Sequence, residues 1–232
     1  MTRIDPVDEL GPSCTCQRYI NPRTDPAMTT NSGATDRARG ELRRQQVLDA
    51  AAACFREHGF HGTSIQRISQ AVGMSPGHIY HYFENKEFIV AGIVEHYLHE
   101  TLEIVGQVEE ASKSIGLVEA ITAHVETSIA LRSGKKRVSL DLEILAEASR
   151  NPVIAEALRH ADKSFRSRMR DLLLQSLALR SVPKAELDAR ITVMSTLFDG
   201  LSTRTLCDPT LSKSDTTRVI ERVLRVLFEE PK

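Results

Sequence analysis

The chain has 232 residues, 41% of them hydrophobic and 26% charged, and its formal net charge is −1 at pH 7. This is the composition of an ordinary globular protein with one large domain or two modest ones, and the net charge alone does not indicate nucleic acid. No apolar run reaches about 18 residues and the first residues lack an apolar secretory core, which argues against a membrane span and a signal peptide. We therefore expect a cytoplasmic protein without a membrane partner.

Residues 1–36 are predicted to be a disordered extension. Their prolines stand among mostly polar residues, with too few apolar side chains to bury a core: Pro6, Pro12, Pro22 and Pro26. Met28 lies inside this segment, and the sequence leaves open whether translation starts there. Cys14 and Cys16 are too close together for a zinc knuckle and have no second pair beside them, so no metal site is expected.

The first helix is predicted over residues 41–58. Its apolar side chains recur with a helical period: Leu48, Ala51, Ala52 and Phe55. Gly59 follows, at a position where helices commonly end in a left-handed residue. Thr63 and Gln66 fit a capping box, in which the Thr63 hydroxyl accepts from the Gln66 backbone N–H. A second helix is therefore expected to start near Ser64.

A short third helix is the most informative part of the chain. Gly73 suits the tight turn of a helix-turn-helix, Ser75 can cap the next helix, and Pro76 fits its first turn. Ile79 and Phe83 would anchor this helix to a core. The side chains left facing outward are Pro76, Gly77, His78, Tyr80, His81 and Tyr82. Such a set suits DNA, because a reading helix presents its N-terminal residues to base edges while neighbouring groups contact phosphates.

Basic residues on either side extend this interpretation. Asn85 can cap a fourth helix, and Lys86 in its first turn suits a phosphate oxygen. Four arginines at the front would form a basic arm on the DNA, or else only a solvated helix start: Arg37, Arg39, Arg43 and Arg44. Tyr80 could also pack its ring in the core and expose only its hydroxyl.

The rest of the chain is predicted to be helical, without a strand or a repeat. The fourth helix should run from residue 86 to near Val105, and a break is expected at 112–116. A fifth helix would carry Val118, Ile121, Val125 and Ile129 and end at 132–134. Residues 138–149, apolar nearly all round, would form a short buried helix.

Three further helices complete the second half. Asn151 and Pro152 begin a long one, which carries Met169 and side chains seven apart: Leu158, Phe165, Leu172 and Leu179. Pro183 precedes the next, and after a break at 208–209 either Ser214 or Asp215 would cap the last. The sequence therefore predicts an all-α fold of about nine helices. Residues 37–88 would form a helix-turn-helix DNA-binding domain, and residues 89–232 a helical domain for ligand binding and dimerisation.

Residues 41–88 resemble the DNA-binding domain of the tetracycline-repressor (TetR) family. The matching positions keep their spacing throughout: Val47, Leu48, Ala51, Ala52, Phe55, Gly59, Thr63, Ile68, Gly73, Tyr80, Phe83, Lys86 and Glu87. The resemblance implies that the residues facing bases are Pro76, Gly77, His78 and His81. It implies that the residues facing the DNA backbone are Thr63, Ser64, Ser75, Tyr80 and Lys86. Arg43 and Arg44 of the basic arm complete the predicted DNA contacts.

Residues 139–159, together with 197–201, resemble the effector domain of the choline-operon (BetI-type) repressors of the same family. This implies a ligand chamber among the middle helices and a dimer face on the last two, but it carries over no ligand, because ligand choice varies on one fold. The dimer face would comprise Leu187, Ile191, Met194, Phe198, Leu201, Val219, Val223 and Leu227. The alternative is that these side chains only fill the monomer core.

The effector itself remains open. The candidate ligand contacts are His96, His99, His124, Phe165 and Met169. The three histidines could be polar anchors, metal ligands or solvated side chains. Aromatic residues make up 5% of the chain and tryptophan is absent, which argues against an aromatic cage for a quaternary amine and favours an aliphatic or acyl-like effector. No cofactor is predicted.

The predicted function is a repressor that binds palindromic DNA as a homodimer and is released by a small-molecule effector. A ligand-independent architectural DNA-binding protein would share the reading helix but would need no chamber. An enzyme would have to use Glu95, His96, His99 and Glu100. Because no nucleophile or phosphate-binding loop accompanies that cluster, we predict no enzymatic activity.

Overall fold

The computed structural model describes residues 32–229, and all regular structure in that range is helical, as the sequence predicts. Helix α1 (Ser32–Gly62) begins earlier than expected. Alanine and arginine before residue 41 are strong helix formers, and Asp36 pairs with Arg39 one turn later at 3.5 Å. The predicted disordered extension is therefore wrong at residues 32–36, and its remainder lies outside the described residues. Contacts divide the chain into two units, residues 1–39 and 40–232.

The helix-turn-helix forms as predicted. The regular turns of α1 end at Gly59, whose φ of 70° is positive as expected but whose ψ of 171° is extended. Helices α2 (Ile65–Val72) and α3 (Pro76–Tyr82) follow. Between them Gly73 is left-handed, with φ 69° and ψ 33°, a conformation that glycine adopts without strain. Two short helices are thereby joined by a tight, fixed turn.

Helix α4 (Lys86–Ile115) is longer than expected. Asn85 caps it by accepting from the Phe88 backbone N–H at 3.1 Å. The helix continues beyond Val105 because the apolar side chains that follow also pack in a buried cluster. Val108, for example, is buried one turn later. It ends where Gly116 takes a φ of 86°. One continuous helix thus starts just after α3 and contributes to both buried clusters, with Ile93 in the first and Val108 in the second.

The single helix expected after Gly116 is two helices, α5 (Leu117–Ala123) and α6 (Val125–Arg132). They meet at His124, whose Nδ1 lies 2.8 Å from the Ala120 carbonyl oxygen. A side chain that bonds to a nearby carbonyl competes with the backbone ladder, which explains the interruption. Helix α7 (Lys135–Ala148) follows, and it is not buried all round as predicted, since Leu142 and Leu145 are exposed.

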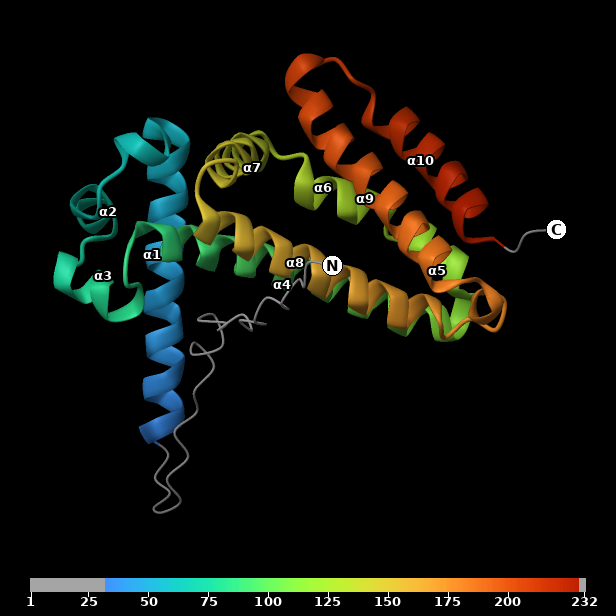
Figure 1. The fold of residues 1–232 in the computed structure, drawn as a ribbon, viewed down its shortest axis with the longest axis horizontal. Coiled ribbons are helices and arrows are strands. Elements are labelled where there is room, and N and C mark those ends of the chain that lie inside the picture. The colour runs from blue at the N-terminus through green and yellow to red at the C-terminus, as the bar shows by residue number, and fades with distance from the viewer. Residues whose placement is uncertain (1–31, 230–232) are drawn as a thin grey trace, which may run out of the picture. The chain divides into compact units, whose positions relative to one another are not determined.

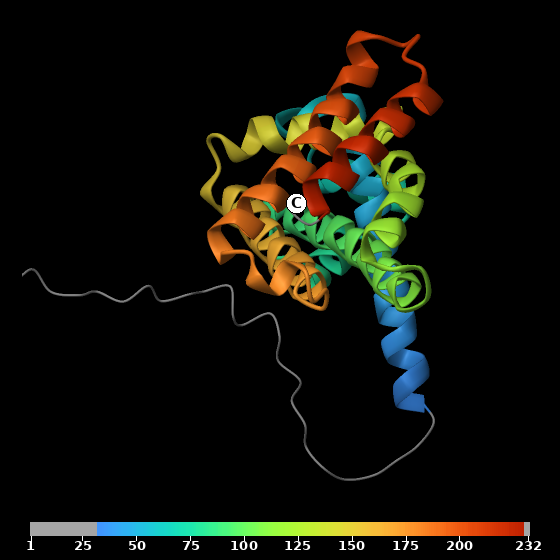
Figure 2. The same ribbon diagram turned by 90° about the vertical axis from the view of Figure 1, so that its right-hand side faces the viewer.

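Three long helices complete the fold in the described residues. Asn151 caps α8 (Pro152–Leu173) as predicted, and a short 3-10 turn (Leu179–Ser181) leads to α9 (Lys184–Cys207). Helix α10 (Lys213–Phe228) is capped by Ser212 and not by Ser214 or Asp215. Figure 1 shows α8 lying along α4, and α9 beside α10, and Figure 2 shows the same pairs from the side.

Two buried clusters hold residues 40–229 together. The first surrounds Phe55, Ile79 and Phe83, and it continues without a break into α7 and α8 through Leu140, Ile144 and Ile154. The second lies between α4, α5, α6, α8, α9 and α10. The core of the helix-turn-helix therefore does not stop at residue 88, and α7 is part of its support.

Two glutamates on α7 add polar contacts to that support. Glu143 accepts from the Phe60 backbone N–H. Glu147, buried one turn later, lies 3.1 Å from the His61 ring and 2.9 Å from Arg150. Two carboxylates of α7 thus hold the turn that ends α1.

Candidate DNA-binding surface and effector cavity

One face of α3 is fixed to the core and the other is left open. Ser75 caps the helix by accepting from the His78 backbone N–H at 3.2 Å, while Ile79 and Phe83 are buried. The side chains that remain exposed are those of Pro76, His78, Tyr80 and His81, with Gly77 beside them. Tyr80 is 53% exposed, so of the two predicted alternatives the surface position is the correct one.

Aromatic contacts order the exposed histidines. The His78 ring stacks on Tyr82 with centroids 5.5 Å apart, and His81 meets the same tyrosine edge-on at 5.1 Å. Tyr82 is half-buried and so does not face outward as fully as predicted. A neutral imidazole carries one donor and one acceptor, which is what contact with base edges requires.

Thr63 does not have the predicted role. Its hydroxyl is turned inward, where it donates to the carbonyls of Gly59 (2.8 Å) and Cys54 (3.1 Å), and the residue is 2% exposed. Ser64 caps α2 instead, accepting from the Arg67 backbone N–H at 3.2 Å. The proposed DNA-backbone contact of the Thr63 side chain is therefore wrong. Ser64 remains exposed at the start of α2.

Lys86 is also committed within the protein. Its Nζ donates to the carbonyls of Phe60 at 2.6 Å and Thr63 at 3.0 Å, and it lies 4.0 Å from the Phe60 ring centroid. Burial lowers the pKa of this ammonium, an effect that Glu87 and Glu147 oppose. Carbonyls at a helix end attract a cation, so Lys86 ties α4 to the end of α1. These hydrogen bonds favour a structural role for Lys86 over the predicted contact with a phosphate.

The predicted basic arm is only partly available. Arg37, Arg39 and Arg43 are exposed. Arg44, in contrast, lies 3.0 Å from Glu95 of α4 and its guanidinium stands over the Phe83 ring. Arg44 therefore joins α1 to α4, and its prediction as a freely accessible DNA contact is corrected.

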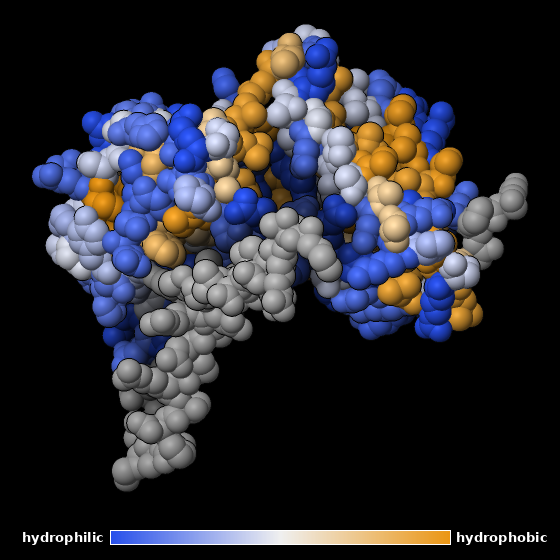
Figure 3. Space-filling view, viewed as in Figure 1, coloured by the Kyte–Doolittle hydropathy of each residue, from blue (hydrophilic) through white to orange (hydrophobic). Residues whose placement is uncertain are grey.

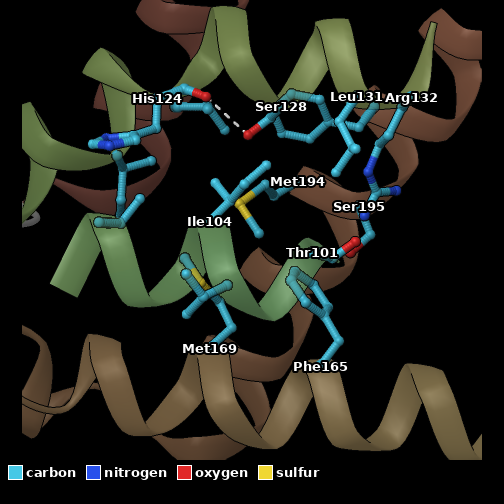
Figure 4. Close-up of a pocket in the computed structure, with 15 residues that line it drawn as sticks. Thr101, Ile104, His124, Ser128, Leu131, Arg132, Phe165, Met169, Met194 and Ser195 are labelled. Atoms are coloured by element: carbon cyan, nitrogen blue, oxygen red, sulfur yellow. Dashed lines mark hydrogen bonds between the residues drawn. The ribbon is translucent and has the colours of Figure 1, made fainter. Parts of the chain in front are cut away.

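An apolar cavity of about 60 Å³ lies inside the second core (Figure 4). Three of the predicted ligand contacts line it, namely His124, Phe165 and Met169. Because the Ala120 carbonyl can only accept, His124 donates from Nδ1, and in the neutral ring Nε2 is left as an acceptor. We call this space the inner cavity.

A larger hollow of about 320 Å³ adjoins it between α4, α7, α8 and α9. Sequence reasoning missed its charged residues, because no single helix shows them as a group. Arg137 bonds Asp141 and Glu100 and covers the Tyr97 ring, while Arg132 bonds Asp199. Burial raises the pKa of the Asp141 carboxyl, and the nearby positive charge of Arg137 opposes this rise. We call this space the outer groove.

His96 and His99 lie elsewhere. They pair along α4 with Glu100 (3.6 Å) and Glu103 (3.3 Å), and neither lines the inner cavity or the outer groove. The structure therefore gives no support to their prediction as ligand contacts. No group of three or more His, Cys, Asp or Glu in residues 32–229 is placed to hold a metal ion.

Two sequence models of known families match most of the described chain. Residues 47–93 match the bacterial regulatory proteins of the tetR family, and residues 118–229 match the C-terminal domain of BetI-type transcriptional repressors. The chain belongs to the TetR family. Both resemblances that the sequence suggested are thereby confirmed, and the members named below are transcriptional regulators rather than enzymes.

Relatives of this TetR-family protein share a quarter to a third of its aligned residues. The transcriptional regulator UidR of Escherichia coli (strain K12) is 30% identical over 132 residues, which cover 55% of this chain and 65% of UidR. The alignment thus spans slightly less than two thirds of that relative. The repressor AcnR of Corynebacterium diphtheriae is 26% identical over 205 residues, 81% of this chain and 90% of AcnR.

Solved structures share the fold. A TetR-family regulator from Mesorhizobium loti superposes with a TM-score of 0.67 at 19% identity, covering 82% of this chain and 96% of its own. Salmonella enterica GusR gives 0.65 at 24% identity, with 81% and 95% covered. FadR from Bacillus subtilis, solved with stearoyl-CoA, gives 0.61 at 19% identity, with 81% and 99% covered. At these identities the likeness concerns the fold alone.

The predicted dimer face of this TetR-family protein must be redrawn. Four of its α9 residues are buried in the monomer core, which is what the alternative expected: Leu187, Ile191, Met194 and Phe198. Leu201 and Leu227 pack partly against the same core. The large apolar side chains that α9 and α10 leave exposed are Val193, Leu206, Val219, Val223 and Val226. Figure 3 shows apolar surface gathered over α10.

None of the helices in residues 32–229 is long and apolar enough to cross a membrane.

Proposed function

We propose that this TetR-family protein is a repressor that binds a palindromic operator as a homodimer and leaves it when a small molecule binds. In this proposal residues 37–88 read the DNA, and residues 89–232 bind the effector and dimerise. Acting on chromosomal DNA would place it in the cytoplasm. The observation that carries the proposal is the position of α4, which begins beside the reading helix and contributes Thr101, Ile104 and Val105 to the inner cavity.

The DNA contacts we propose come from the exposed face of α3. Pro76, Gly77, His78 and His81 would face base edges, and Ser64, Ser75 and Tyr80 would face phosphates together with Arg43. All of these residues are exposed. Lys86 and Thr63 would support this surface from behind by fixing the turn between α1 and α2.

Release would follow from a shift in α4. A ligand that fits only one arrangement of α4, α6, α8 and α9 would change how the start of α4 holds α3, and its leverage equals its difference in affinity for the two arrangements. In a dimer, two reading helices must stand about 34–36 Å apart to reach successive major grooves. A small change at each α4 would disturb that spacing.

Dimerisation is proposed through α9 and α10. The valine cluster defined by Val193, Val219, Val223 and Val226 leaves apolar surface in water, with Val226 at 79% exposure. Paired helices from two subunits can bury such surface as a four-helix interface. Val223→Glu should give a monomer in analytical ultracentrifugation, whereas Val153→Glu, an exposed apolar position on α8, should leave the dimer intact. A native protein that is monomeric at micromolar concentration contradicts the proposal.

A ligand-independent architectural DNA-binding protein is the competing function. It needs no space for an effector, and the inner cavity therefore favours the regulator. Selection of genomic fragments by the purified protein separates the two. A short palindrome recovered by the native chain and by the Lys163→Ala control, but weakened by His78→Ala and His81→Ala, supports the repressor. Binding without sequence preference supports the architectural protein, and no DNA binding contradicts both.

A further inference from the structure

The inner cavity and the outer groove share one polar boundary. The residues that line both are Thr101, Arg132, Phe165 and Ser195. Figure 4 shows that Thr101, Arg132 and Ser195 lie at one side of the inner cavity, with His124 at the other and Ile104, Met169 and Met194 between them. A molecule that occupies the cavity therefore meets apolar side chains along its length and hydrogen-bonding groups where the cavity opens to the groove.

Arg132 is the cation at this boundary, and its present partner can leave. Its Nη1 donates to Asp199 Oδ1 at 2.8 Å. The Arg132 side chain is 24% exposed and that of Asp199 is 68% exposed. Asp199 is the more exposed partner and can turn toward water, although burial still raises the pKa of its carboxyl, an effect that Arg132 opposes. Arg132 remains largely covered by the protein.

This asymmetry decides which charge a bound head group should carry. A cationic head group would pair with Asp199 and take from Arg132 its hydrogen-bonded partner, leaving only the weaker attraction of Asp141 in the same groove. The Arg132 guanidinium does not lose its proton in proteins. A covered cation without a partner is costly. An anionic head group would instead replace Asp199, which is the more exposed of the two partners. The exchange keeps Arg132 paired throughout.

The neighbouring hydroxyls suit a carboxylate. Thr101 Oγ1 donates its proton to the Tyr97 carbonyl at 2.9 Å. Among residues 32–229 the Ser195 hydroxyl has no hydrogen-bond partner, so its proton can be donated to a ligand oxygen. Arg132 and Ser195 together offer donors for the two oxygens of one carboxylate.

The inner cavity limits the size of the apolar part of the bound molecule. Its volume of about 60 Å³ is less than half of the roughly 150 Å³ of an engineered apolar cavity that holds benzene. The flexible side chains of Met169 and Met194 in its wall can adapt to a thin chain. A short aliphatic chain fits these conditions better than an aromatic ring.

We propose that the effector is a small carboxylate with a short aliphatic chain, whose head group binds Arg132 and Ser195 in place of Asp199. This identification of the effector rests on the proposed function in one respect, namely that the carboxylate bound here is also the molecule that releases DNA. The binding itself is measured without DNA, so the two proposals fail separately.

The test is isothermal titration calorimetry on the full chain with hexanoate, hexan-1-ol and hexylamine, which share one chain length. Hexanoate should bind at least tenfold more tightly than the other two, and across butyrate, hexanoate and decanoate the affinity should not keep rising with length. Arg132→Gln should weaken hexanoate binding at least tenfold and leave hexan-1-ol unchanged. Asp199→Asn should keep or increase hexanoate affinity.

Arg170→Gln is the matched control, because Arg170 also pairs with an α9 carboxylate, Asp188, but lines neither space. It should bind hexanoate like the native protein. Ser195→Ala, a milder change, should weaken hexanoate about threefold to tenfold if Arg132→Gln fails to fold. The inference is overturned if hexylamine binds more tightly than hexanoate, or if neither Arg132→Gln nor Ser195→Ala weakens hexanoate binding. It is also overturned if none of the probes binds. Operator binding in the last case would leave the repressor proposal standing.

Discussion

The first turns of α2, α3 and α4 are held very differently from those of α5, α6 and α7. In the first group a serine or asparagine side chain caps each helix, namely Ser64, Ser75 and Asn85. In the second group no side chain caps the start, at Gly116, His124 or Gly134. The proposed DNA-binding surface is thus fixed by local caps. Helices α5 and α6, which contribute Ile121 and Ser128 to the inner cavity, depend at their starts on their packing neighbours.

The largest expected effect tests the difference between the two cores. Phe83→Ala removes a fully buried ring and should lower the free energy of unfolding by about 3–5 kcal/mol. Phe165→Ala removes a ring from a wall that already borders empty space, so the loss should be about half of that or less. Urea denaturation of both variants measures the two values. Equal losses would mean that the cavity is closed and packed like the first core.

Lys86→Met sharpens the comparison at the support of the reading helix. It keeps the apolar stem but removes both hydrogen bonds to carbonyls, and should cost about 1–3 kcal/mol of stability. Lys113→Met, an exposed lysine on the same helix, should change stability by less than about 0.5 kcal/mol. The salt dependence of operator binding should stay unchanged for Lys86→Met. If Lys86→Met instead reduces the slope of the logarithm of operator affinity against the logarithm of salt concentration by about one, Lys86 contacts a phosphate after all.

A side-chain cap can be removed from α3, which has one, and added to α7, which has none. Ser75→Ala should cost about 1 kcal/mol, because the His78 N–H loses its acceptor. Gly134→Asp should stabilise the protein by about 0.5–1 kcal/mol, since a side chain there meets nothing within 4 Å and the residue already has a φ of −63°. Thermal melts of both variants check the signs. A loss of stability in Gly134→Asp would show that α7 is held at its start in another way.

The smallest effect concerns the cysteines. Burial raises the pKa of the Cys54 thiol, so at pH 8 less of it is thiolate than in an ordinary cysteine, and labelling should be slow. Cys207 is exposed and should label at once. Time courses with a thiol reagent, in a background with Cys14→Ser and Cys16→Ser, separate the two. Fast labelling of Cys54 in native buffer would mean that the first core opens readily.

Prediction from sequence succeeded where the cause is local. Ser75 with Pro76, Gly73 and Asn85 each act within one helical turn, and each was placed correctly. Thr63 and Ser64 are adjacent hydroxyls, and the carbonyls of Gly59 and Cys54 at the end of α1 decide that Thr63 turns inward. Lys86 likewise takes its role from carbonyls more than twenty residues away. Such contacts leave no periodic signal in the chain.

The cavity and the dimer face were harder to predict for the same reason. Helix α9 carries enough apolar residues for a core and a partner, and only the packed structure shows that Ile191 faces inward and Val193 outward. The Arg132 and Asp199 pair joins helices 67 residues apart in sequence. His124 lines the inner cavity, whereas His96 and His99 could not be oriented without knowing which side of α4 meets α8.

The continuation of the first core into α7 limits how such regulators can be recombined. A chimera that joins residues 1–88 to a foreign effector domain would leave the underside of the reading domain without Leu140, Ile144 and the two carboxylates that hold the turn after Gly59. The exchangeable module is therefore discontinuous in sequence. It consists of the reading domain together with the facing surface of α7, and a working hybrid has to inherit both.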